Sequence, residues 1–216
     1  SLSVPVPTTR RSRHAAAALA AGALTAGLLV AVPSTASAAT PVTIAAIQGT
    51  GRLSPLVGQE VTTTPSVVTA AYPTGGLKGF VIQTPGTGGK KRSLKKASDA
   101  VFVYTDDAPV DVKVGDLVSV SGTVEEYRSG SGADADTLTE IAGAVSVSKS
   151  DASYKKVKPV SGVTWASTYD RRENLESMLF SSTEKWTVND TYDLGTYGEL
   201  GLATGGRLVQ PTDKAT

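Results

Sequence analysis

The sequence predicts an all-β fold, built as a small closed barrel or a sandwich. From Pro41 onward, short runs of apolar and β-branched residues alternate with Gly, Pro, Asp and Ser. No run of helical length repeats apolar residues at i, i+3, i+4 and i+7. About five strands are expected in roughly 100 residues, at a spacing that is typical of small barrels and sandwiches.

The strands are expected where β-branched and aromatic residues gather between turn residues. Pro65 interrupts one of these runs, which indicates an edge or a bulge, because proline cannot donate to a strand ladder. The expected strands cover residues 42–48, 59–72, 79–84, 100–106, 116–127 and 136–141.

One expected strand, "DLVSVSGTVEEY" at residues 116–127, carries Gly122 in its interior. A small barrel needs one strand that bends sharply enough to belong to both halves of the closed sheet. We therefore interpret Gly122 as the bend of a single long strand rather than as a ligand contact.

From residue 39 onward, the chain divides into three parts by composition. Residues 39–147 are expected to form the barrel domain, residues 148–164 a polar linker, and residues 165–216 a shorter β-rich segment. Within that last segment the pattern predicts a short helix in residues 165–179 and strands at 185–190, 197–203 and 207–210.

Residues 1–38 have the three parts of a helical secretory signal peptide. Three arginines precede the apolar run of residues 15–32, and "PSTASA" supplies a small-x-small cleavage site. Cleavage is expected between Ala38 and Ala39, which predicts a secreted, extracellular protein without a stable membrane anchor. An uncleaved anchor is the alternative, because the apolar run approaches spanning length. The adjacent Arg10 and Arg11 leave twin-arginine and general secretory export both open.

Charge and residue content restrict the chemistry of the mature chain. Without the three arginines of residues 1–38, 18 Lys and Arg stand against 20 Asp and Glu, a formal net charge of −2. His14 is the only histidine and there is no cysteine. The mature chain therefore has no catalytic triad, no Cys/His pair and no usual zinc site. Carboxylate pairs and carboxylate-bound Mg²⁺ or Ca²⁺ remain chemically possible.

Several stretches resemble the large bacterial secreted nucleases that carry an oligonucleotide-binding-type (OB) β-barrel ahead of an endonuclease/exonuclease/phosphatase catalytic domain. They are "IAAIQGTGRLSPLVGQEVTT", "GGLKGFVIQTPGTGG", "SDAVFVYTDD", "VGDLVSVSGTVEEY" and "LTEI", followed by "NLESMLF", "TVNDTYDLGTYGEL" and "GGRLVQPTDKA". Together they cover nearly all of the mature chain.

The resemblance implies an OB-like barrel over residues 39–147, with residues 165–216 leading toward a nuclease domain that this chain lacks. The resembling nucleases catalyse cleavage with histidines, carboxylates and an asparagine around a divalent metal. Mg²⁺ or Ca²⁺ is therefore expected only for that absent domain. We therefore expect no catalytic residue and no cofactor in this chain, and no nuclease activity from it alone. The chain is interpreted as a fragment, a truncated gene product or a natural short form.

A basic run, "GGKKRSLKKAS", lies between two expected strands. In OB barrels the face of strands 2 and 3 and certain flanking loops contact nucleic acid. Such a run could track a phosphate backbone, binding single-stranded or duplex DNA weakly and without sequence preference. A solvated connecting loop is the plainer alternative. The candidate residues are Lys90, Lys91, Arg92, Lys95 and Lys96.

Phe80, Phe102 and Tyr104 lie on the expected strands that flank the basic run, and Phe102 and Tyr104 share one face. Aromatic side chains on an open barrel face can stack on unpaired bases. Aromatic side chains on barrel strands also serve as core, so both interpretations stay open. Asp134, Asp136 and Glu140 suggest either a calcium loop or, more simply, a solvated hairpin.

Three function classes follow. The first is an accessory nucleic-acid-binding or positioning module of a secreted nuclease, whose partners are DNA and a C-terminal nuclease domain. The second is a structural module that docks to carbohydrate or the cell surface. The third is an enzyme that uses carboxylates alone.

Overall fold

The computed structural model describes residues 40–106, 108, 110–128, 137–165 and 168–208. All of these described residues belong to one compact unit. The expected signal peptide and its cleavage site lie outside the described residues. In the described ranges, no helix is long and apolar enough to cross a membrane.

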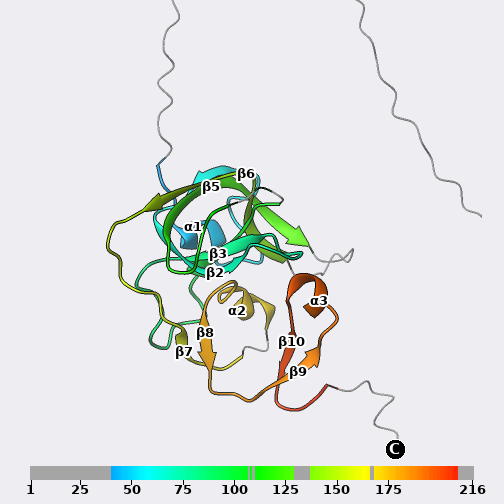
Figure 1. Cartoon of the computed structure of the whole chain (residues 1–216). Coiled ribbons are helices and arrows are strands. Elements are labelled where there is room, and N and C mark those ends of the chain that lie inside the picture. Colours follow the sequence, from blue (N-terminus) through cyan, green and yellow to red (C-terminus); the bar gives the residue numbers. More distant parts are fainter. Residues whose placement is uncertain (1–39, 107, 109, 129–136, 166–167, 209–216) are drawn as a thin grey trace, which may run out of the picture. The chain divides into compact units, whose positions relative to one another are not determined.

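The larger sheet closes on itself (Figure 1). Its strands follow one another in the order β1-β5-β2-β3-β4-β6, and β5 also pairs with β6. All neighbours are antiparallel except β4 and β6, which run parallel. The expectation of a mainly β fold is confirmed. The strands are β1 (Glu60–Thr62), β2 (Ser66–Tyr72), β3 (Gly79–Gln83), β4 (Ala100–Tyr104), β5 (Leu117–Arg128) and β6 (Thr137–Ser150).

Strand β5 runs without a break through Gly122 and joins both halves of the ring. Its first part pairs with β2, and Gly122 itself lies opposite Val61 of β1. The register between β5 and β6 shifts at this glycine. A Cβ on Gly122 would come within 2.7 Å of Ile141 Cγ2, so β6 crosses too closely for a side chain. The bend expected at this position is therefore present.

The first expected strand is wrong, because residues 42–48 contain the helix α1 (Ile44–Gln48). Thr43 caps this helix, its side chain accepting a hydrogen bond from the Ala46 N–H at 3.3 Å. In a strand, Ile44 and Ile47 would point to opposite faces, whereas three residues apart on a helix they share one face. Both are fully buried in the ring core.

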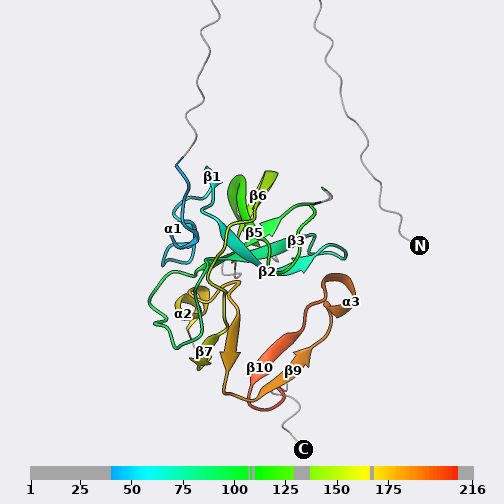
Figure 2. The same ribbon diagram turned by 60° about the vertical axis from the view of Figure 1, so that its left-hand side comes forward.

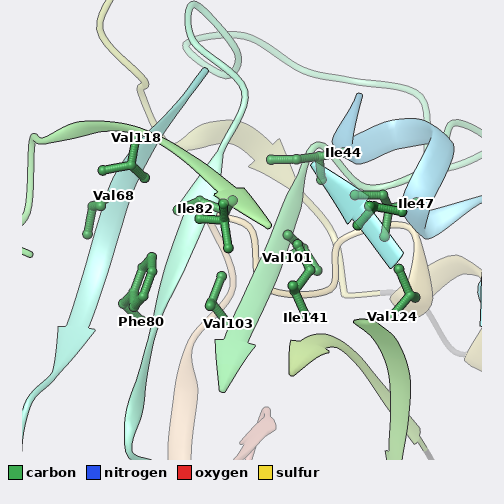
Figure 3. Close-up of a cluster of buried hydrophobic side chains, with 12 residues drawn as sticks. Ile44, Ile47, Val68, Phe80, Ile82, Val101, Val103, Val118, Val124 and Ile141 are labelled. Atoms are coloured by element: carbon green, nitrogen blue, oxygen red, sulfur yellow. The ribbon is translucent and has the colours of Figure 1, made fainter. Parts of the chain in front are cut away.

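The core inside the ring consists of aliphatic side chains with a single aromatic ring, that of Phe80 (Figure 3). Period-two alternation on β5 places Val118, Val120 and Val124 on the inner face, and each is fully buried. Buried groups from α1 and from all six strands meet there, so the ring needs no disulfide.

The chain beyond the ring forms two short sheets (Figure 2). Strand β7 (Val160–Val163) pairs in parallel with β8 (Phe180–Ser182), and α2 (Tyr169–Glu173) lies between them in sequence. Strands β9 (Trp186–Asp190) and β10 (Gly201–Thr204) form an antiparallel pair joined through α3 (Leu194–Tyr197). The expected short helix and the strand at 185–190 are confirmed.

The two other strand expectations in this part differ from the structure. Residues 197–203 are strand only from Gly201, because Leu194–Tyr197 turn into α3. Arg207 and Leu208 lie outside any strand. Residues 209–210 lie outside the described residues.

A second buried cluster joins this C-terminal part to the ring. Val81 of β3 and Phe102 of β4 point outward from the ring and pack with Leu175 and Met178, which follow α2. Strands β3 and β4 are thereby buried on both faces, which agrees with their continuous apolar runs.

Candidate functional site

The segment 151–159, expected to be part of a polar linker, is bonded to the loop between β3 and β4. The Gly86 N–H donates to the Lys155 carbonyl at 2.8 Å, and the Lys158 N–H donates to the Thr87 carbonyl at 3.0 Å. The Gly89 N–H donates to the Pro159 carbonyl at 2.9 Å. Residues 148–150 of the expected linker belong to β6, and its last part contains β7.

These two chain segments line an open surface hollow of about 440 Å³, here named the lysine hollow. One wall is the glycine-rich loop of residues 86–89 with Lys90. The other wall carries Lys155, Lys156 and Lys158. Among the residues that the structure describes, no carboxylate and no aromatic side chain belongs to its lining. The arrangement concentrates positive charge on a chain whose residues 39–216 carry a formal net charge of −2.

The lysines of this surface are free to meet a ligand. Lys90, Lys155, Lys156 and Lys158 are all exposed, as is the neighbouring Lys91. Across the described part of the chain, no ion pair involves any of the five. Each therefore offers a hydrated ammonium group on a flexible stem.

The sequence candidates include Lys90 of the loop wall but none of the three lysines of the other wall. Lys155, Lys156 and Lys158 form the run "KKVK", but the sequence pattern predicts only a polar linker there. A second cluster of positive charge was visible in the sequence, whereas its pairing with residues 86–89, about seventy positions earlier, was not. Lys95 and Lys96 are also exposed, although they do not line the hollow.

Arg92, a candidate for nucleic-acid contact, is instead committed to internal contacts. Its guanidinium donates to the Ala97 carbonyl at 2.7 Å and to the Asn174 carbonyl at 3.3 Å, and it contacts the Met178 sulfur. It also pairs with Asp99 at 3.3 Å, and its side chain is only 12% exposed. Arg92 therefore ties the β3–β4 loop to the segment after α2.

We expect Arg92→Ala to lower the free energy of unfolding by about 2 kcal/mol. The substitution leaves buried carbonyl acceptors without a donor and the Asp99 carboxylate without its ion-pair partner. Arg92→Lys should recover only part of this loss, since one ammonium cannot replace the planar fork. Urea unfolding measures both, with the exposed Lys95→Ala as control. A stable Arg92→Ala protein that has lost affinity for nucleic acid would place Arg92 in the interface instead.

The aromatic candidates do not form a stacking surface in this structure. Phe80 is 1% exposed and lies inside the ring (Figure 3). Phe102 lies on the outer face of β4 but is 6% exposed, since Leu175 and Met178 cover it. Tyr104 shares that face, as expected, is partly buried, and donates to Asp106 Oδ1 at 3.2 Å. The prediction that Phe80 and Phe102 stack on bases is therefore wrong, because both side chains are buried in packed clusters.

A group of partly buried carboxyl groups lies where the segment after α2 meets the ring. Glu176 Oε1 accepts hydrogen bonds from Gln48 Nε2 and from the Thr139 N–H, both at 3.1 Å. Burial raises the pKa of Glu176 to about 8, and the negative charge of Glu173 adds to the rise. Glu126 Oε1 accepts from the Ser54 N–H at 2.7 Å and from Thr139 Oγ1 at 3.0 Å. Glu176 is therefore largely protonated at neutral pH, which suits a packed contact.

Glu140, part of the possible calcium loop, is 6% exposed on β6. Burial raises its pKa to about 7, and the nearby Glu125 and Glu126 carboxylates contribute. Asp134 and Asp136 lie outside the described residues. Over the described ranges, no three acidic, histidine or cysteine side chains are arranged to hold a metal ion.

No family model, no curated protein and no solved structure matches this chain. The site must therefore be interpreted from its own residues.

Proposed function

We propose that this chain is an accessory nucleic-acid-binding or positioning module of a secreted nuclease of the endonuclease/exonuclease/phosphatase family. The observation that carries the proposal is the lysine hollow, where four lysines from two distant segments converge without a carboxylate in the lining. Polyanion affinity of a chain with net negative charge has to come from such a local surface. The alternating sugar-phosphate backbone of DNA is the extended anion that this surface suits.

The proposal includes an OB-like barrel as the finer description of the closed ring. Its support is the ring of five longer strands β2 to β6 with one parallel pair, closed between β5 and β6. OB barrels bind oligonucleotides on the face of strands 2 and 3. With β2 counted as the first strand, that face belongs to β3 and β4, whose outward residues Val81 and Phe102 are covered. Nucleic acid is therefore expected at the lysine hollow.

The proposed role is to hold nucleic acid, and cleavage would belong to a separate catalytic domain. In the resembling enzymes a divalent metal, Mg²⁺ or Ca²⁺, serves that catalytic domain. Export through the signal of residues 1–38 would bring the module to extracellular DNA.

The test is fluorescence anisotropy of a labelled single-stranded oligonucleotide with residues 39–216 at several salt concentrations. If three or four phosphates are neutralised, log affinity should fall with log salt at a slope of about −2 to −3. Serine at Lys90, Lys91, Lys155, Lys156 and Lys158 together should abolish binding at low salt. Absence of binding by the parent protein at low salt would contradict the proposed function.

A second candidate, a docking module without a nucleic-acid role, is favoured by the β9–β10 pair. Val188 and Leu202 lie directly opposite each other and are 49% and 50% exposed. Tyr192, in the connection between these strands, is 88% exposed. Exposed apolar side chains on one strand pair and its connection are typical of a surface that contacts a neighbouring domain. Under this alternative, replacing the five lysines with serine leaves docking of the module to its neighbour unchanged.

A further inference from the structure

The lysine hollow is assembled from two segments whose main chains touch. Gly88 has φ +81°, and a Cβ there would lie 1.6 Å from the Lys158 carbonyl oxygen. The glycine lets the loop approach the segment 151–159 at backbone distance. Tyr154 anchors the same segment at its other end, its hydroxyl donating to the Gly115 carbonyl at 2.5 Å. The lysines are therefore brought together by main-chain contacts, whatever their side-chain rotamers.

The chemistry of the lining selects phosphate groups over bases. Lysine ammonium groups act as point charges toward phosphate oxygens, and glycine and threonine leave the loop surface open. No aromatic ring of the described residues lines the hollow, so a base finds no stacking partner among them. Single strands and duplexes should therefore be bound through the same backbone phosphates, without reading of sequence.

Electrostatics also couples the ligand to the fold. Lys90 belongs to the loop wall, whereas Lys155, Lys156 and Lys158 belong to the segment that leads from β6 into β7. Like charges on the two walls repel each other, which opposes the three main-chain hydrogen bonds that join the walls. An anion that binds among the lysine ammonium groups of both walls reduces this repulsion and is attracted to both walls.

We propose that the lysine hollow is a two-walled phosphate clamp. It binds the nucleic-acid backbone by charge alone, and its occupancy holds the segment 151–159 against the β3–β4 loop. This inference rests on the proposed function, because it specifies the ligand chemistry of the same surface. A ligand that binds only the closed arrangement stabilises that arrangement by mass action. The segment leading into β7 would thus be fixed when nucleic acid is bound.

The experiment follows hydrogen exchange of the three amides that join the walls, those of Gly86, Gly89 and Lys158. The probes are a single-stranded oligonucleotide, a duplex of the same length and inorganic tripolyphosphate, which has no base. At a free ligand concentration 100 times Kd, local opening should be suppressed about 100-fold. All three probes should slow exchange at these amides, and tripolyphosphate should displace both nucleic acids.

Two triple variants with the same charge change provide the comparison. Serine at Lys155, Lys156 and Lys158 removes one wall of the clamp and should lose at least tenfold in affinity together with the amide protection. Serine at Arg128, Arg171 and Lys185, which are exposed and outside the hollow lining, should retain both. Equal loss in the two variants would overturn the clamp, since binding would then follow net charge alone.

The remaining outcomes separate the clamp from the proposed function. Oligonucleotide binding without protection of the three amides would overturn the clamp and leave the proposed function standing. Protection by tripolyphosphate without any oligonucleotide binding would contradict the proposed function, and with it the assignment of the ligand as a nucleic-acid backbone. A marked preference for the single strand would also overturn the clamp, because it requires base contacts.

Discussion

Gly88→Ala is expected to separate the two walls of the lysine hollow. A Cβ at this position would lie 1.6 Å from the Lys158 carbonyl oxygen, a main-chain atom that no side-chain rotation can move. The φ of +81° adds backbone strain for any residue with a side chain. We expect a loss of about 3 kcal/mol in the free energy of unfolding, from strain and broken main-chain hydrogen bonds. Oligonucleotide affinity at low salt should fall about tenfold, since each wall alone carries fewer charges.

Gly162→Ala is the matched control. Gly162 also has a positive φ, +63°, but a Cβ there would meet no atom within 4 Å. This variant isolates the cost of the backbone conformation, about 1 kcal/mol, and should leave affinity unchanged. Urea unfolding and fluorescence anisotropy measure the two effects. Equal behaviour of the two alanine variants would show that the approach of Gly88 to Lys158 does not hold the surface together.

Glu176→Gln is expected to make the protein more stable at alkaline pH. Gln48 Nε2 and the Thr139 N–H both donate to Glu176 Oε1, and a glutamine oxygen can accept the same two hydrogen bonds. The substituted side chain stays neutral at every pH, whereas Glu176 must ionise in a partly buried position as the pH rises. At pH 9 we expect the variant to exceed the parent by on the order of 3 kcal/mol.

The raised pKa of Glu176 sets the direction in which stability changes with pH. The pKa of Glu176 is about 8 in the folded protein and 4.5 in an unstructured chain, so the folded state binds the proton more tightly. The stability contributed by this proton is complete below pH 4.5 and is lost as the pH rises toward 8. The two proteins should therefore converge near pH 4. A smaller decline should persist in the variant, because the pKa of Glu140 is also raised, to about 7.

Urea unfolding midpoints between pH 4 and pH 9 measure this difference. Glu60→Gln, which removes an exposed carboxylate of β1, is the control and should follow the parent at every pH. A Glu176→Gln protein that is less stable than the parent at pH 9 would mean that Glu176 is ionised and usefully paired in the folded state.

Local pattern was enough for most strands but not for the first element. Residues 42–48 contain isoleucine and valine, which favour strands, and the sequence alone predicts a strand there. The ring core decided otherwise, because a capped helix can bury Ile44 and Ile47 together. Local β propensity is a weak preference that tertiary burial overrides.

For the candidate site, the sequence indicated a basic surface but not which residues form it. Lys90 and Lys91 are exposed and Lys90 lines the hollow, whereas Arg92 is held by Asp99 and by main-chain carbonyls. A charge run does not reveal which of its members meet buried acceptors. Those acceptors come from segments distant in sequence, here the one that follows α2.

By itself the sequence determined the mainly β class and the single long strand through Gly122, because period-two alternation and a glycine inside a strand are local signals. It also determined that residues 39–216 contain no histidine and no cysteine. Only the tertiary structure decided that the C-terminal segment covers Phe102, and that Lys155, Lys156 and Lys158 face the β3–β4 loop. Alternation marks the two faces of a strand, whereas what covers each face depends on long-range packing.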